Sequence, residues 1–204
     1  FNPCDEVGST IQMAQTLIQQ NADNIRQIKS AAEDKIHKLA YYDQLTGLPN
    51  RIQFLQKLTD QAHAASDADA GTHKRFAVIA MDLDHFKDIN DSMGHNIGDA
   101  ILRGVGKRLR AALPESAVVA RSGEDEFAIT MPLSTDVNTA RDVEEKVVRV
   151  IRSEPFKVFN EAFQIRASVG VSTFPDDGAD PDQVLKNADI ALNRAKEEGR
   201  DTIK

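Results

Sequence analysis

The chain has 204 residues, a formal net charge of -7 at pH 7 and a single cysteine, Cys4. Its length suits one globular domain of about 160 residues with a short appendage. The acidic balance argues against nucleic acid as a partner, and a lone cysteine excludes an internal disulfide framework. No apolar run reaches the roughly 18 residues that span a membrane, so we expect no direct membrane contact.

The chain begins at Phe1 and ends at Lys204, and we expect it to be a fragment of a longer protein. It carries no signal-peptide pattern. We therefore expect the fragment to be cytoplasmic, within a multidomain or membrane-anchored sensor whose sensing part lies outside it.

Apolar or small residues recur every seven positions at Ile11, Ile18, Ile25, Ala32 and Leu39. Because residues 9–42 contain neither proline nor glycine, this pattern predicts one long amphipathic helix. The helix either lies on its own domain or forms a parallel coiled-coil stalk, and its narrow stripe favours the stalk. Asn21 and Lys35 interrupt the stripe, so the coil would be weak or adjustable. We expect residues 1–40 to be a stalk that joins two copies into a homodimer, and residues 41–204 to be the functional domain.

After the stalk, Gly47 and Pro49 break the helix, and Asn50 is a candidate N-cap for the next one. Helices and strands then follow in a mixed order, which predicts an α/β (α+β) domain with a mainly antiparallel sheet flanked by helices. The expected helices are 51–65, a short one after 84, 98–112, 136–152 and 180–199. The expected strands are 75–84, two hairpin strands 117–122 and 126–132, and two more hairpin strands 156–159 and 163–173.

Carboxylates cluster at two points that the predicted sheet could bring together. Asp82 and Asp84 alternate at the end of the apolar strand, so their side chains share a face. Residues 124–126, "EDE", lie at the tip of the first hairpin. Such acids occur on solvated surfaces, but converged and buried they repel one another and require a cation. Carboxylate and carbonyl ligands suit Mg²⁺ or Mn²⁺ rather than Zn²⁺.

Three cations could complete a site for a triphosphate, whose chemistry commonly uses such carboxylate-bound metals. Lys87 follows the first acidic pair, and Lys196 and Arg200 are four residues apart on one helix face. Taken singly, each is an ordinary surface cation. Together with the acidic edge, they form a candidate phosphate clamp.

Five segments resemble, in order and spacing, the motifs of GGDEF domains, the diguanylate cyclase family of bacterial cyclic di-GMP signalling. The resemblance runs from about Leu39 to Lys204 and implies a palm-like nucleotidyl cyclase fold. The segments are "YYDQLTGLPNR", "MDLDHFKDINDSMGHNIGD", "RSGEDEFAI", "ASVGVSTFP" and "ADIALNRAKEEGR".

The resemblance also implies roles for individual residues. The metal would be held by the carboxylates of Asp82 and Asp125 and by the carbonyl of Leu83. Asp125 and Glu126 would be the catalytic acids. Guanine would be read by Asn90 and Asp99, since an amide and a carboxylate complement its Watson–Crick edge. The triphosphate would contact Phe86, Lys87, Lys196 and Arg200, and His85 fits equally a loop over the phosphates and an exposed helix start.

Active members of the family bring two GTP-loaded domains face to face, and each 3′-hydroxyl attacks the α-phosphorus of the other GTP. Each domain holds half of a reaction centre. A parallel coil could therefore set the geometry of the encounter.

The signature departs from the family at its second glycine, because Glu124 follows Gly123. We expect strain, since a hairpin tip with positive φ disfavours glutamate. We also expect repulsion, since this backbone lies close to the α-phosphate in the family. Like charges about 4 Å apart at an effective dielectric near 20 repel by about 4 kcal/mol, which slows a reaction about a thousandfold. This is an upper value, because a flexible glutamate can turn away.

A second departure concerns product inhibition. The family often carries an RxxD motif five residues before the signature, where this chain has "PESA" over Pro114–Ala117. Arg121 lies too close to the signature to replace that motif, so we expect no inhibitory product site.

Three functions follow from these features. The first is a GTP-binding regulatory domain with lost or weak cyclase activity, which adjusts an adjoining domain such as an EAL phosphodiesterase after Lys204. The second is a working diguanylate cyclase that tolerates Glu124 and acts as a homodimer. The third is a dimerisation module that binds no nucleotide, against which the intact set of predicted GTP contacts argues.

Overall fold

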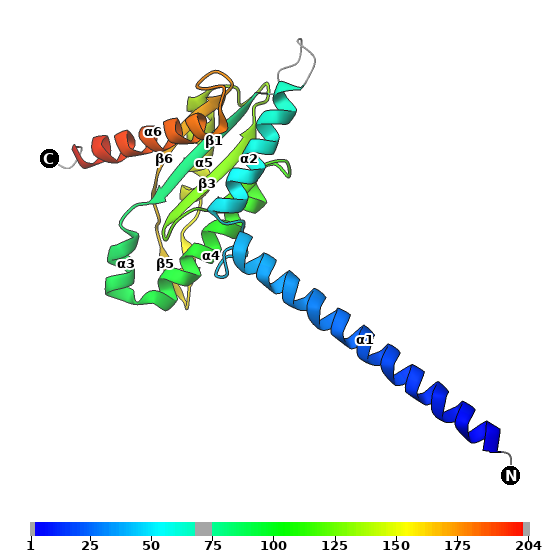
Figure 1. Cartoon of the computed structure of the whole chain (residues 1–204). Coiled ribbons are helices and arrows are strands. Elements are labelled where there is room, and N and C mark those ends of the chain that lie inside the picture. Colours follow the sequence, from blue (N-terminus) through cyan, green and yellow to red (C-terminus); the bar gives the residue numbers. More distant parts are fainter. Residues whose placement is uncertain (1–2, 68–74, 202–204) are drawn as a thin grey trace. The chain divides into compact units, whose positions relative to one another are not determined.

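The computed structural model describes residues 3–67 and 75–201, apart from the side chains of Arg200 and Asp201. The chain divides into two compact units, residues 1–40 and residues 41–204. The first is helical, and the second is a sheet covered by helices (Figure 1).

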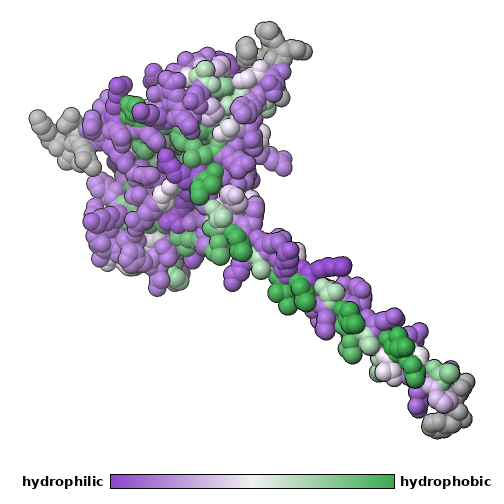
Figure 2. Space-filling view, viewed as in Figure 1, coloured by the Kyte–Doolittle hydropathy of each residue, from purple (hydrophilic) through white to green (hydrophobic). Residues whose placement is uncertain are grey.

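The first unit is made by α1, Pro3–Tyr41, a helix of 39 residues. It begins before the predicted start at residue 9 and continues through Gly8. None of the described residues of α1 is buried, and apolar side chains follow one another along it in Figure 2. Ile18 and Ile25 of the heptad stripe are 69% and 65% exposed. In the described part of the chain, no helix is long and apolar enough to cross a membrane.

The second unit is built on a four-stranded sheet in the order β2-β3-β1-β6, with every neighbouring pair antiparallel. This confirms the predicted α/β class with a mainly antiparallel sheet. Every residue of the central strand β1 is buried. The elements are α2 (Arg51–Ser66), β1 (Phe76–Leu83), α3 (Phe86–Met93), α4 (His95–Ala112), β2 (Val118–Arg121), β3 (Glu126–Pro132), α5 (Ala140–Arg152), β4 (Phe156–Val158), β5 (Glu161–Phe163), β6 (Ala167–Phe174) and α6 (Pro181–Asp201).

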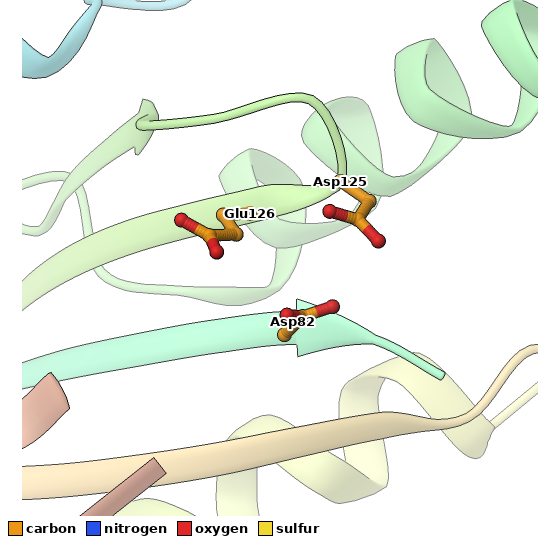
Figure 3. A group of neighbouring side chains, drawn as sticks. All are labelled: Asp82, Asp125 and Glu126. Carbon is orange, nitrogen blue, oxygen red and sulfur yellow. The ribbon is translucent and has the colours of Figure 1, made fainter. Parts of the chain in front are cut away.

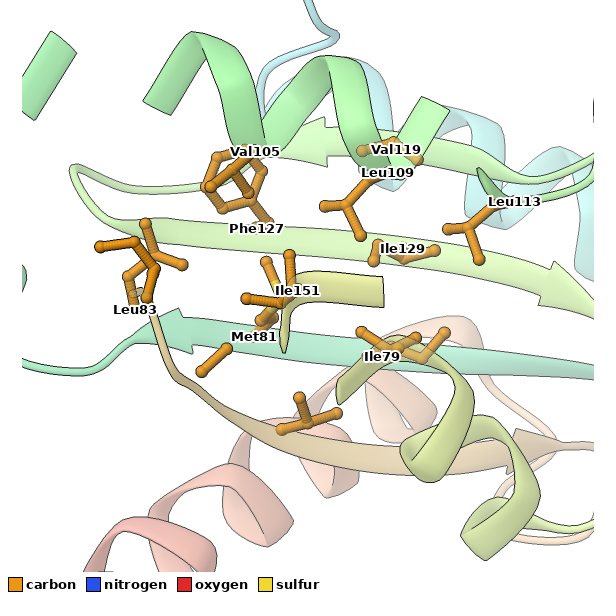
Figure 4. Close-up of a cluster of buried hydrophobic side chains, with 14 of the residues drawn as sticks. Ile79, Met81, Leu83, Val105, Leu109, Leu113, Val119, Phe127, Ile129 and Ile151 are labelled. Carbon is orange, nitrogen blue, oxygen red and sulfur yellow. The ribbon is translucent and has the colours of Figure 1, made fainter. Parts of the chain in front are cut away.

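Side chains of β1 alternate between two hydrophobic clusters, one on each face of the sheet, as the period of a strand requires. Ile79 and Met81 join the cluster beneath α4 and α5, which Figure 4 shows with Phe127 and Ile151. Val78 and its alternate neighbours join the other cluster, beneath α2 and α6. Because both faces are covered, even Asp82 near the end of β1 is buried.

In the second unit, α4 and α5 begin several residues away from their predicted starts. α4 begins at His95, directly after Gly94 at φ 92°, three residues before the predicted start at 98. α5 begins at Ala140 rather than 136, because Thr139 caps it. The Thr139 hydroxyl accepts from the Asp142 N–H, and the Asp142 carboxylate accepts from the Thr139 N–H. This reciprocal pair satisfies two N–H groups at the helix start.

The prediction that strands 156–159 and 163–173 form a hairpin is wrong about the second strand. β4 pairs with the short strand β5 in a separate two-stranded sheet, whereas β6 pairs with β1 in the central sheet. The turn is formed by Phe159 and Asn160, both at positive φ (47° and 67°). Two consecutive residues at positive φ make a two-residue hairpin loop. The second strand of the hairpin, β5, therefore starts at Glu161. β6 is a separate strand that pairs with β1 in the central sheet.

Candidate functional site

Three of the predicted acidic residues lie together at one end of β1 and β3. The register of these strands sets Asp82 opposite Glu126, on the sheet face that α2 and α6 cover. Asp125 directly precedes β3. One carboxylate oxygen from each of the three lies within 4.8 Å of the others (Figure 3). The fold thus brings together acids that are more than 40 positions apart in the sequence.

Backbone hydrogen bonds hold the signature turn against the end of β1. The Leu83 N–H donates to the Asp125 carbonyl (3.1 Å). The N–H groups of Ser122 and Gly123 both donate to the Glu126 carbonyl (3.0 and 3.3 Å). A Cβ added at Gly123 would lie 2.9 Å from a carboxylate oxygen of Glu126. The Glu126 side chain therefore lies against Gly123 and would have to shift to admit a larger residue.

Asp82 is buried and has two charged neighbours. Burial raises the pKa of Asp82 above its ordinary value of 3.8, while the hydrogen bond from Lys196 opposes this shift and the charge of Asp125 adds to it. The Lys196 ammonium donates directly to Asp82 Oδ2. Asp84 is not in the group of three, and its carboxylate accepts a hydrogen bond from the Ser168 hydroxyl (2.7 Å).

A cavity of 330 Å³ opens onto the acidic group. Its lining brings together most of the residues predicted for the metal and the phosphates. They are Asp82, Leu83, Phe86, Lys87, Asp125 and Lys196, with Asp84, His85, Ser168 and Gly199 beside them. His85 starts α3 in the left-handed region (φ 57°) with its side chain exposed, so it fits both of its predicted descriptions. Arg200 lies in α6, and its side chain is outside the described residues.

Asn90 and Asp99, which were predicted to bind guanine, are not among the described residues that line this cavity. Asn90 of α3 is buried, and its side-chain oxygen has no hydrogen-bond partner among the described residues. It packs on Gly98 of α4, where an added Cβ would lie 1.8 Å from that oxygen. Asp99 is the next residue of α4 and is half-buried. Asn90 and Asp99 therefore lie where α3 meets α4. The Asn90 side-chain oxygen has no hydrogen-bond partner among the described residues.

The predicted strain at Glu124 is wrong. Among the described residues, positive φ at a non-glycine residue occurs at His85, Phe159 and Asn160, and not at Glu124. Arg121 stabilises the turn, because its Nε and Nη2 donate hydrogen bonds to the Glu124 carbonyl (3.2 and 2.7 Å). The Glu124 side chain is exposed. Glutamate is tolerated here because the turn needs no left-handed residue.

Arg121 and Asp43 were not predicted as parts of the site. Arg121 Nη1 donates to Asp43 Oδ1 (3.0 Å), and both side chains are largely buried. The other Asp43 oxygen accepts from the N–H and hydroxyl of Thr46 (2.8 and 2.6 Å). Burial alone would raise the pKa of Asp43, but the bonds from Thr46 and the charge of Arg121 bring it below 3.8. The sequence signal that could have indicated this ion pair was Asp43, the single acidic residue in "YYDQLTGLPN".

The donor set suits a hard divalent cation. Asp82, Asp125 and Glu126 offer oxygen ligands only, as Mg²⁺ and Mn²⁺ prefer. Asp82 is buried beside Asp125 and Glu126, and neighbouring carboxylates raise the cost of its charge unless a cation is present.

The fold is that of the palm-like nucleotidyl cyclases, and its acidic edge is a candidate metal centre. The family described as "Diguanylate cyclase, GGDEF domain" matches residues 40–202. The chain belongs to this GGDEF family, and its second unit is a cyclic di-GMP signalling domain of the diguanylate cyclase type.

Individual relatives agree with this assignment. The cyclic di-GMP phosphodiesterase NbdA of Pseudomonas aeruginosa is 39% identical over 169 residues, which are 83% of this chain and 21% of NbdA. A sensory box/GGDEF family protein of Caulobacter crescentus has a solved structure with a TM-score of 0.70 and 34% identity, covering 78% of this chain and 99% of that one. The coiled coil and GGDEF domain of DgcB from Caulobacter crescentus, solved with c-di-GMP, has a TM-score of 0.70 and 26% identity, covering 90% and 95%. The chain spans about a fifth of the length of the first curated relatives it matches.

Proposed function

We propose that this domain binds GTP with a divalent metal and that Glu124 leaves it with lost or weak diguanylate cyclase activity. The observation that carries the proposal is one cavity lined by metal-type carboxylates and by two lysines suited to phosphate, beside a turn with one additional acid. Family membership supplies the reaction class, the condensation of two GTP to cyclic di-GMP and pyrophosphate.

Each residue would act on a different part of GTP. Asp82, Asp125 and the Leu83 carbonyl would hold Mg²⁺ or Mn²⁺, which when bound neutralises phosphate charge and activates a hydroxyl. Glu126 would assist as the second catalytic acid. Phe86 and the cations Lys87, Lys196 and Arg200 would contact the triphosphate.

Asn90 and Asp99 would read guanine. The unpaired buried oxygen of Asn90 supports this role, because such a group costs free energy unless a ligand satisfies it. The assignment of oxygen and nitrogen in an amide is interchangeable, and in either orientation the amide can bond guanine.

Glu124 would act through charge rather than backbone strain. Its exposed carboxylate is solvated, so repulsion of a nearby phosphate lies between about 1 kcal/mol at the dielectric of water and about 4 kcal/mol at a dielectric near 20. Binding through the distant contacts would survive, since none of them is replaced. Cyclisation needs the α-phosphate beside this turn and would be slowed.

Two copies would meet through α1, residues 1–40 being the stalk and residues 41–204 the catalytic-type domain. The exposed stripe of α1 supports this arrangement, as does the similarity to a coiled coil and GGDEF domain in DgcB. The residues in place of the RxxD motif, Pro114–Ala117, form a turn closed by the Ala117 N–H on the Pro114 carbonyl (2.9 Å). They offer no arginine for product, so feedback inhibition would be absent.

The impaired domain would regulate an adjoining output domain, such as an EAL phosphodiesterase, by reporting whether GTP is bound. Similarity to NbdA, itself a cyclic di-GMP phosphodiesterase, supports this reading. The second candidate is an active homodimeric cyclase. It is favoured by the unstrained backbone of Glu124, which lets the signature turn keep its place.

Calorimetry with GTP and Mg²⁺ tests the proposal. We expect GTP binding by the native chain and a loss of at least about tenfold in affinity for Asp82→Ala, in line with the effect of altering metal ligation. Asp60→Ala on the exposed surface of α2 is the matched control and should bind normally. Full affinity in Asp82→Ala would refute the metal assignment, and no binding at millimolar GTP would leave only a scaffold.

A further inference from the structure

A carboxylate proposed to bind the metal, Asp82, and a lysine proposed to bind phosphate, Lys196, are hydrogen-bonded to each other in this structure. Lys196 Nζ donates to Asp82 Oδ2, and the side chains are 31% and 10% exposed. The two residues are 114 positions apart. Their proposed partners in the loaded domain are different, the metal for Asp82 and the triphosphate for Lys196.

The approach of Lys196 follows from the packing of α6 on β6. Gly170 lies beneath the helix, and a Cβ added there would lie 2.2 Å from the Leu192 nitrogen and 2.3 Å from the Ala188 carbonyl oxygen. Residues 188, 192 and 196 are each one helical turn apart, so they share a face. Ala188 and Leu192 are buried on the sheet. The same face therefore carries Lys196 to the end of β1, where Asp82 lies.

The contact has an electrostatic cause. Asp82, Asp125 and Glu126 bring up to three negative charges together. The Lys196 ammonium brings a positive charge to this group, and it bonds to an Asp82 oxygen that the proposed metal would also use. Lys87 lines the same cavity, but in the described part of the chain it is the Lys196 ammonium that bonds to an acid there.

We propose that Lys196 is an internal counter-ion of the nucleotide-free domain, bound to Asp82 until metal and triphosphate enter together and draw it to the phosphates. The inference rests on the function proposed above and adds a regulation to it. Lys196 competes with a free metal ion for Asp82, so the empty domain binds metal poorly. The triphosphate offers Lys196 another partner, so GTP and metal each strengthen the binding of the other.

Mn²⁺ binding without nucleotide tests this inference, measured by the loss of the free Mn²⁺ paramagnetic resonance signal. We expect Lys196→Gln to bind Mn²⁺ at least about fivefold more tightly than the native chain, the lower end of typical coupling between sites. Lys186→Gln removes the same charge from an exposed position of α6 and should match the native affinity. Lys196→Arg keeps the cation and should also stay close to native. Circular dichroism confirms that each variant is folded.

A second titration, of Mn²⁺ in the presence of a non-hydrolysable GTP analogue, measures the coupling. The factor by which the analogue tightens Mn²⁺ binding should be smaller in Lys196→Gln than in Lys186→Gln. Equal Mn²⁺ affinities in these two variants, with binding abolished in Asp82→Ala, would overturn the role of Lys196 alone. Mn²⁺ binding that Asp82→Ala leaves unchanged would overturn the metal site and this inference together.

Discussion

At the scale of single residues, we propose that Glu124 limits the cyclisation that the signature supports. Its backbone conformation is ordinary, and Arg121 donates a hydrogen bond to its carbonyl, so the proposed effect on cyclisation rests on its side-chain charge. That charge is exposed, which screens it and places its effect near the lower end of the range from about 1 to 4 kcal/mol.

We expect Glu124→Gly to raise the rate of cyclic di-GMP formation by at least about fivefold, which corresponds to about 1 kcal/mol of barrier. GTP affinity should change less than the rate, because the distant contacts are the same. Glu124→Gln tests the cause, since it removes the charge and keeps the bulk. If Gln has no effect and Gly does, the obstacle is steric, and if neither changes the rate, our account of Glu124 is wrong.

The ion pair of Asp43 and Arg121 predicts a pH-dependent contribution to stability. The pKa of Asp43 is below its ordinary value of 3.8, so the unfolded chain binds a proton there more readily than the folded one. The contribution is full above the unfolded pKa and is lost as pH falls through the folded pKa. We expect Asp43→Asn to lower the free energy of unfolding by about 1 kcal/mol at pH 7.

Urea unfolding at several pH values measures this difference between the native chain and Asp43→Asn. The difference should stay constant above about pH 5 and shrink below about pH 4. Asp60→Asn on α2, which is exposed, is the control and should show no such trend. A difference that persists unchanged at pH 3 would show that the charge of Asp43 is not its cause.

Residues of this kind mark the limit of what the sequence could predict. The acids Asp82, Asp125 and Glu126 were found because each belongs to a motif, and their convergence follows from strand order. Arg121 was considered only as a substitute for a missing motif, because its bonds to Asp43 depend on a loop 78 positions away. Strain at Glu124 was predicted from the family glycine, whereas the actual turn depends on backbone bonds that no residue type reveals.

At the scale of elements, the placement of α6 over β6 depends on Gly170. We expect Gly170→Ala to lower the free energy of unfolding by about 3 kcal/mol or more, because its Cβ would meet helix backbone that cannot turn aside. Gly104→Ala is the matched control on α4, where the added Cβ meets a ring carbon of Phe156 at 3.1 Å. Its cost should be under about 1 kcal/mol, since alanine favours the helix.

Chemical denaturation of both variants measures these costs. Equal stability losses would show that the close approach of α6 is not specific to Gly170. The order of most elements was predictable from apolar periodicity and from glycine and proline. The β4–β5 hairpin was not, because its turn residues, Phe159 and Asn160, are not the Asn-Gly pair that normally announces two positive φ values.

At the scale of the whole molecule, α1 would determine how two domains meet. Its stripe is exposed within the chain, and burying such a stripe is what drives a coiled coil. We expect Ile25→Asp to weaken self-association of the full chain at least about tenfold in sedimentation equilibrium, because a charge in the seam costs more than about 1.4 kcal/mol. Gln27→Asp adds the same charge outside the heptad positions and should associate as the native chain does.

Dimers that survive Ile25→Asp unchanged would show that the apolar stripe is not the interface. This prediction depends on a pattern that the sequence displays in full, since the heptad positions need no tertiary contacts to be recognised. The proposed meeting of two GTP-binding faces, by contrast, depends on a second copy and could not be predicted from periodicity.

We propose that the domain as a whole holds GTP but converts it poorly to cyclic di-GMP. This proposal is tested most directly by incubating the native chain at high concentration with Mg²⁺ and GTP and separating the nucleotides by chromatography over time. We predict GTP that remains bound to the protein, with cyclic di-GMP formed at least about fivefold more slowly than by Glu124→Gly under the same conditions. Rapid conversion of GTP to cyclic di-GMP by the native chain, at the rate of that variant, would contradict the account.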